Sequence, residues 1–78
     1  MSKEEKELNF KIKKTLGILS ESEKGWTTEL NYMIWNNGEP KYDIRAWSPD
    51  HTKMGKGITL DKESLKSLWK ILDKKYNK

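Results

Sequence analysis

The sequence predicts an α+β fold in which four β-strands are followed by one C-terminal helix, in the order ββββα. Apolar and polar residues alternate along three stretches between residues 8 and 48, which is the period of strands with one buried face. The segment Asn36-Asn37-Gly38 interrupts this alternation with a hairpin signal. After Asp61 the apolar residues recur at three- and four-residue spacing, which is typical of an amphipathic helix.

The first two strands are expected at residues 8–20 and 26–35, joined by a polar connector that contains a glycine. One parity of these strands is apolar and is predicted to face the core: Phe10, Ile12, Leu16, Ile18, Leu30, Tyr32 and Ile34. The other parity of the second strand is mostly polar, although it includes Met33 and Trp35, and it is predicted to face solvent.

The third strand is expected at residues 41–48, and a short fourth strand at residues 56–60 follows a loop. The core parity of the third strand holds Tyr42, Ile44 and Ala46. The opposite parity holds Lys41, Asp43, Arg45 and Trp47. Gly57 suggests a β-bulge in the fourth strand, because a glycine inside a strand often marks such an irregularity.

The helix begins after Asp61, which is well suited to cap it. Its apolar side chains are Leu65, Leu68, Trp69, Ile71, Leu72 and Tyr76. They cover an arc of about 160°, wider than the ~100° stripe that docks on a single sheet. Part of the arc therefore needs a second surface, and a symmetric partner helix is the simplest one. We predict a homodimer whose interface contains Leu65, Leu68, Trp69, Leu72 and Tyr76.

The chain of 78 residues has room for one domain, expected at residues 8–78 after a polar segment, residues 1–7, that we expect to be flexible. It contains no cysteine, so no disulfide or thiolate metal site reinforces so small a core. The formal net charge is +4, which suits a polyanionic partner. No apolar run reaches the roughly 20 residues of a membrane span, and we expect a cytoplasmic protein.

The sequence offers little for catalysis or metal binding. His51 is the one histidine of the chain, and no cysteine accompanies it to complete a zinc site. Glu29, Glu39 and Asp43 are each explained as solvated strand or turn residues, and not as a converging acid–base pair. We therefore expect a binding protein without a cofactor, and neither an enzyme nor a protein with a small-molecule substrate.

A group of basic and aromatic residues on the parity opposite the predicted core is more informative. It consists of Trp35, Lys41, Arg45 and Trp47, and we expect Lys11 and Lys13 to extend it onto the first strand. Exposed rings beside Lys and Arg are how sequence-tolerant single-strand binders stack bases and hold phosphates. The alternative is that a loop or a dimer partner covers the tryptophans.

Two motifs resemble the single-stranded-DNA-binding domain of the positive cofactor four transcriptional coactivators, and especially its small bacterial YdbC-type branch. They are Tyr42-Asp43-Ile44-Arg45-Ala46-Trp47 and, leading into the helix, Met54-Gly55-Lys56-Gly57-Ile58-Thr59-Leu60. With the opening strand Phe10-x-Ile12-x-Lys14, the likeness covers nearly the whole domain. The resemblance implies a strongly curved antiparallel sheet, dimerisation through the helices, and a groove for single strands formed by both subunits. It assigns DNA contacts to Lys14, Trp35, Arg45, Trp47 and Lys56.

We therefore predict a homodimer that binds single-stranded DNA with little sequence preference, in transcription or DNA maintenance at the nucleoid. The predicted contacts are Lys11, Lys13, Lys14, Trp35, Lys41, Arg45, Trp47, Lys53 and Lys56. RNA is an alternative ligand, because stacking and phosphate contacts are available in both nucleic acids. A further alternative is a protein-interaction adaptor of the transcription machinery whose basic face meets an acidic protein surface.

Overall fold

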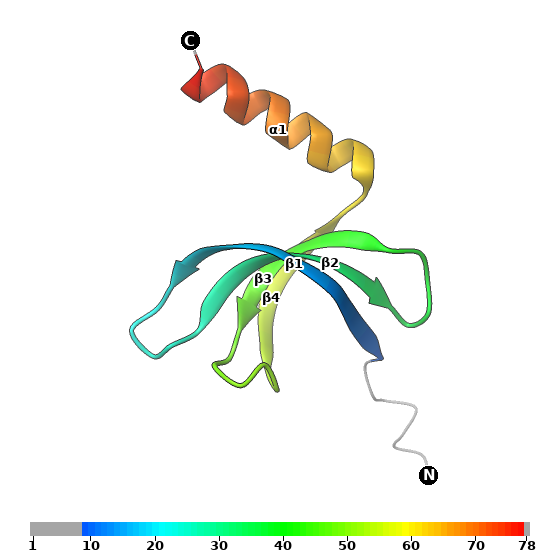
Figure 1. Ribbon diagram of the computed structural model, residues 1–78, viewed down its shortest axis with the longest axis vertical. Helices are drawn as coiled ribbons and strands as arrows, with labels where there is room; N and C mark the ends of the chain where they lie inside the picture. The colour runs from blue at the N-terminus through cyan, green and yellow to red at the C-terminus, as the bar shows by residue number, and fades with distance from the viewer. Residues whose placement is uncertain (1–8, 78) are drawn as a thin grey trace.

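The computed structural model describes residues 9–77, which form one four-stranded antiparallel sheet and one helix (Figure 1). The strands pair in sequence order: β1 (Phe10–Glu21), β2 (Thr27–Trp35), β3 (Lys41–Trp47) and β4 (Met54–Leu60). The helix, α1 (Lys62–Tyr76), follows β4 directly. The predicted order ββββα is confirmed. The predicted flexible segment, residues 1–7, lies outside the described residues.

The sheet is strongly curved, with α1 above its convex side (Figure 1). The register between β1 and β2 shifts at three places along β1, between Ile12 and Lys14, Thr15 and Gly17, and Ile18 and Ser20. Each such bulge bends a strand and increases its twist, so three of them in one strand account for the arch. We call the concave side the inner face and the side toward α1 the outer face.

The hairpin between β2 and β3 is the tight turn that the sequence predicts. Asn36 and Asn37 have φ angles of 51° and 62°, and the Gly38 N–H donates to the Trp35 carbonyl at 2.8 Å. Positive φ at both central residues is the geometry of a type I′ turn, which asparagine tolerates better than most residues. The turn reverses the chain between β2 and β3.

The bulge predicted at Gly57 is confirmed. Arg45 pairs with Gly57 but Trp47 pairs with Met54, so β4 carries one extra residue between these two pairs, directly before Gly57. A Cβ at Gly57 would lie 2.2 Å from the Ile44 carbonyl oxygen and 2.2 Å from the Arg45 Cβ. Only glycine therefore allows β4 to approach β3 this closely.

The inner face holds the buried side chains of the sheet. Met33 and Trp47 are fully buried, and so are the polar side chains of Asn31 and Asp43. The sequence placed this parity toward solvent, and that expectation is wrong. Because the sheet is curved, the side chains of its inner face pack against one another and bury these residues, with no second layer among residues 9–77.

The outer face is less enclosed than predicted. Leu30 and Ile44, expected in the core, are only half-buried. They border an apolar groove of about 370 Å³ between sheet and helix, lined by Leu19, Leu30, Ile44, Leu65, Leu68, Trp69 and Leu72. No residue of α1 is buried, and Tyr76 is 72% exposed. Within residues 9–77 the helix thus covers the outer face only in part.

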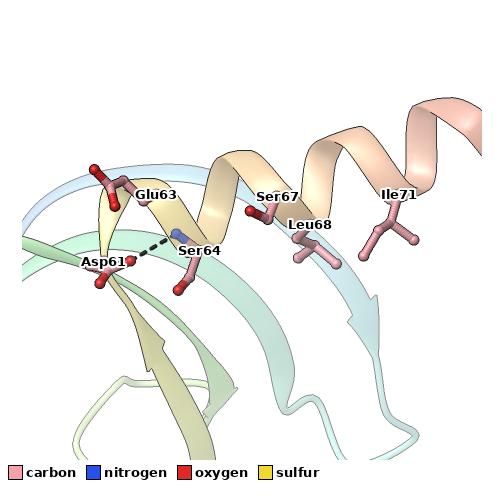
Figure 2. A pocket seen from close by; sticks show the side chains of 6 residues that line it. All are labelled: Asp61, Glu63, Ser64, Ser67, Leu68 and Ile71. Atoms are coloured by element: carbon pink, nitrogen blue, oxygen red, sulfur yellow. Dashed lines mark hydrogen bonds between the residues drawn. The ribbon is translucent and has the colours of Figure 1, made fainter.

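The start of α1 follows the sequence prediction. The Asp61 Oδ1 atom accepts a hydrogen bond from the Ser64 N–H at 2.7 Å, which satisfies one of the free donors of the first turn (Figure 2). Figure 2 also shows Leu68 and Ile71 extending from one flank of the helix, and Ile71 is 64% exposed. Within the described residues α1 is neither long nor apolar enough to cross a membrane.

We predict that Gly57→Ala destabilises the protein by at least about 1–3 kcal/mol, because the added methyl group overlaps the β3 backbone. Gly17→Ala in β1 is the control, since no atom lies within 4 Å of a Cβ there. Urea unfolding of the two variants measures the difference. Equal stability of the two variants would show that β4 can move away from β3 at little cost.

We also predict that Trp47→Ala lowers the free energy of unfolding by about 3–5 kcal/mol, as is usual for loss of a fully buried tryptophan. Trp47→Phe should cost less, because it leaves a smaller cavity. Denaturation followed by circular dichroism tests both variants. A wild-type unfolding midpoint for Trp47→Ala would mean that the ring contributes nothing to the inner-face core.

Candidate nucleic-acid interface

Five planar side chains follow one another across the inner face, and we call this row the inner-face stack. His51 lies against Trp47, with ring centroids 5.5 Å apart and planes at 21°. Phe10 contacts both Trp47 and Trp35, at 5.4 and 5.7 Å between centroids, with its ring tilted by 55° and 50° to theirs. The Arg45 guanidinium carbon lies 5.0 Å from the centroid of Trp35. The members come from β1, β2, β3 and the β3–β4 loop, so only the folded sheet brings them together.

Arg45 is held in place by Asp43. Its Nε and Nη2 atoms donate to the two carboxylate oxygens of Asp43, at 2.7 and 2.9 Å. The Thr59 hydroxyl donates to the same carboxylate at 2.9 Å. Asp43 is fully buried, so removal of Arg45 would leave a buried charge unpaired, at a typical cost of about 3–5 kcal/mol. Arg45 therefore stabilises the fold in addition to presenting its guanidinium beside Trp35.

Glu29 is the second buried carboxylate of the inner face. It accepts hydrogen bonds from the Thr27 hydroxyl at 2.5 Å and the Asn31 amide at 3.2 Å, and its Oε2 atom lies 2.8 Å from His51 Nε2. Burial raises the pKa of Glu29, but these hydrogen bonds and the charge of His51 together lower it below its ordinary value. Glu29 thus stays ionised and ties the β3–β4 loop to β2.

The β3–β4 loop, residues 48–53, is cross-linked by its own hydrogen bonds. Asp50 Oδ1 accepts from the hydroxyls of Ser48 and Thr52 and from the Thr52 N–H, at 2.7 to 3.1 Å. These bonds lower the pKa of Asp50 to about 2. The Lys53 N–H donates to the Ser48 hydroxyl at 3.0 Å. His51 is held within this loop at a φ of 60°.

The structure brings the predicted group of Trp35, Lys41, Arg45 and Trp47 onto one face, the inner face, as their shared parity requires. The expectation that Trp47 is exposed is wrong, since the side chain is fully buried. Phe10 and His51 lie against its ring and enclose it. Trp35 is half-buried and is the more accessible indole.

Lys11 and Lys13 do not extend the inner face, which corrects the prediction. Lys11 stands opposite Ile34, and the Lys13 Nζ lies 5.8 Å from the centroid of Tyr32, both on the outer face. The register places Phe10 opposite Trp35, so the odd-numbered residues at the start of β1 point outward. Lys14 pairs with Tyr32 and lies on the outer face as well, because of the bulge that follows Ile12.

β3 and the β3–β4 loop supply Arg45, Trp47 and His51 to the inner-face stack. The exposed lysines closest to these residues in sequence are Lys41, Lys53 and Lys56. Lys41 stands opposite Met33 on the inner face. Sequence reasoning missed two members of the stack, Phe10 and His51. Phe10 was placed on the other face, and a lone loop histidine carries no sequence signal for stacking.

Comparisons with known proteins identify the family to which the chain belongs. A family model described as Transcriptional Coactivator p15 (PC4) matches residues 22–71, from the β1–β2 connector into α1. A protein of Treponema pallidum (strain Nichols), described as uncharacterized, is 43% identical over 67 residues, which cover 86% of this chain and 79% of the relative. This relative fits the small bacterial branch that the two motifs predict. The chain belongs to the transcriptional coactivator p15 (PC4) family.

Proposed function

We propose that this protein binds single-stranded DNA across its inner face, with little sequence preference. The observation that carries the proposal is the inner-face stack, in which the half-buried Trp35 lies next to Phe10 and to the Arg45 guanidinium. Every base has a π-face, so stacking on such a surface is worth about 1–3 kcal/mol per base whatever the sequence. Membership of a family of transcriptional coactivators supports a role at DNA during transcription.

The charges around the stack suit a phosphate backbone. The carboxylates of Glu29 and Asp43 are buried and paired, whereas the ammonium groups of Lys41, Lys53 and Lys56 belong to exposed residues. The net charge of +4 adds a long-range attraction for a polyanion. Lysine contacts to phosphates release counterions, so binding of this kind weakens as salt rises.

We further propose that two copies assemble through the outer face and α1. Ile58, Trp69 and Ile71 are 55%, 58% and 64% exposed beside the apolar groove. Large apolar side chains grouped in this way are typical of a surface that another protein covers. A symmetric partner presents the same apolar surface and can cover it without any further chain. This arrangement leaves the inner faces of both copies free for nucleic acid.

We expect Lys56→Ala to weaken binding of oligo(dT) and to reduce the slope of log affinity against log salt by about 0.7 for each phosphate that the lysine neutralises. Trp35→Leu keeps apolar bulk but removes the π-face, and it should weaken binding by about 5- to 150-fold. Fluorescence anisotropy with single-stranded and duplex DNA, at two salt concentrations, measures both effects.

Lys70→Ala, on the exposed side of α1, is the charge control and should bind like the wild type. Arg45→Ala is unsuitable because it also unpairs Asp43. Equal affinity for single-stranded and duplex DNA, unaffected by Trp35→Leu, would contradict base stacking. Failure of the wild type to bind any oligonucleotide would favour the adaptor function, and tighter binding of oligo(U) would favour RNA.

For the dimer, we expect Ile71→Lys to convert the wild-type protein from dimer to monomer. Ile71 is 64% exposed and lies outside the groove, so a monomer tolerates the lysine whereas an apolar dimer interface does not. Sedimentation velocity at micromolar concentration distinguishes the two states, with Lys70→Ala as the neighbouring control. A monomeric wild type in this experiment would exclude the dimer.

A further inference from the structure

We propose that His51 is a base-contacting residue, and that the solvent-facing side of its imidazole ring is a stacking platform for one base of the bound single strand. This inference rests on the proposed function and adds to it a residue that the basic and aromatic pattern of the sequence did not include. Three features of the β3–β4 loop lead to it: the position of the ring, its accessibility and its support.

The ring of His51 lies at one end of the inner-face stack. One side of it lies against Trp47 at an interplanar angle of 21°, which is a stacked arrangement. Trp47 is fully buried, whereas the side chain of His51 is 43% exposed. A base that approaches this end of the stack therefore meets His51 and not Trp47. Histidine is among the side chains on which unstacked bases of single strands pack.

The orientation of the ring is fixed before any ligand arrives. Its Nε2 atom lies 2.8 Å from the buried carboxylate of Glu29, and the His51 N–H donates to the Ser48 carbonyl at 2.8 Å. The hydrogen bonds of Asp50 hold the remainder of the loop. A side chain held in this way loses little conformational entropy when a base stacks on it. Glu29 and Trp47 act here as positioning residues.

The β3–β4 loop also carries a cation that a nucleic acid could contact. Lys53 is exposed at the end of the same loop, two residues from His51. Glu29, the acidic group that contacts His51, is buried beneath it and paired. The exposed residues of this loop thus include an aromatic ring and a lysine, the combination that single-strand binders use, together with Asp50, whose Oδ1 atom is engaged by hydrogen bonds within the loop.

Two substitutions separate the ring from the rest of the side chain. His51→Asn removes the ring and suits the φ of 60°, because asparagine tolerates this backbone region. We expect it to weaken binding of oligo(dT) by about 5-fold or more. His51→Phe keeps a ring on Trp47 but lacks the nitrogen that contacts Glu29, and it should restore affinity to near the wild-type value. Both variants remove the partner of buried Glu29, so circular dichroism first establishes that each keeps the wild-type fold. Asn37→Gly, at a φ of 62° in the β2–β3 turn, is the control for a change at a positive-φ position.

A second measurement uses the unmodified protein. His51 is the one histidine of the chain, so its ring protons are identified without assignment variants. A base stacked on the imidazole shifts these proton resonances upfield through its ring current. We expect this shift with oligo(dT), and no such shift with an abasic phosphodiester of the same length.

The outcomes distinguish this inference from the proposed function. If the wild type binds oligo(dT) and Trp35→Leu weakens binding, the proposed function stands. Wild-type affinity of His51→Asn would then overturn the role of His51, which would only cover Trp47. Equally weak binding by His51→Phe and His51→Asn in variants that keep the wild-type fold, or His51 resonances that do not move at saturation, would overturn it as well. Absence of any binding by the wild type would overturn both proposals.

Discussion

The enclosure of the Trp47 indole is the constraint on which the rest of the structure depends. Among residues 9–77 the helix lies on the outer face and no second layer covers the inner face, and the indole must still be removed from water. The bulges of β1 curve the sheet, and the β3–β4 loop turns back, so that Phe10 and His51 lie against the indole. The curvature of the sheet and the conformation of the β3–β4 loop therefore both serve to bury Trp47.

The same contacts prepare the proposed binding surface. Asp43 fixes the Arg45 guanidinium beside Trp35, and Glu29 fixes His51 against Trp47. Both carboxylates are buried, so they position the groups above them without presenting negative charge to a phosphate backbone. Groups held rigidly before binding cost less entropy when the ligand arrives. The arrangement also means that substitutions in the stack affect folding as well as binding.

Apolar periodicity identified the two faces of β2 and β3 but not which one the monomer buries, and it placed Phe10 and Ile12 of β1 on the wrong face. Leu30 and Ile44 form the apolar parity, yet they are half-buried, whereas Asn31 and Asp43 on the polar parity are buried completely. Periodicity reports where apolar side chains gather, and it carries no information on curvature. In the proposed dimer, the second copy covers the outer face, which carries Leu30 and Ile44.

The sequence by itself determined the order of elements, the hairpin turn at Asn36-Asn37-Gly38, the bulge beside Gly57 and the helix cap at Asp61. Each of these depends on the backbone preferences of a few neighbouring residues, which short motifs express. The family was also evident from two contiguous motifs. Only the tertiary structure decided which rings are accessible, because the neighbours of Trp47 come from β1 and from the β3–β4 loop. The tertiary structure also decided that Lys11 and Lys13 lie on the outer face, because the direction of side chains along β1 depends on its register against β2 and on its bulges.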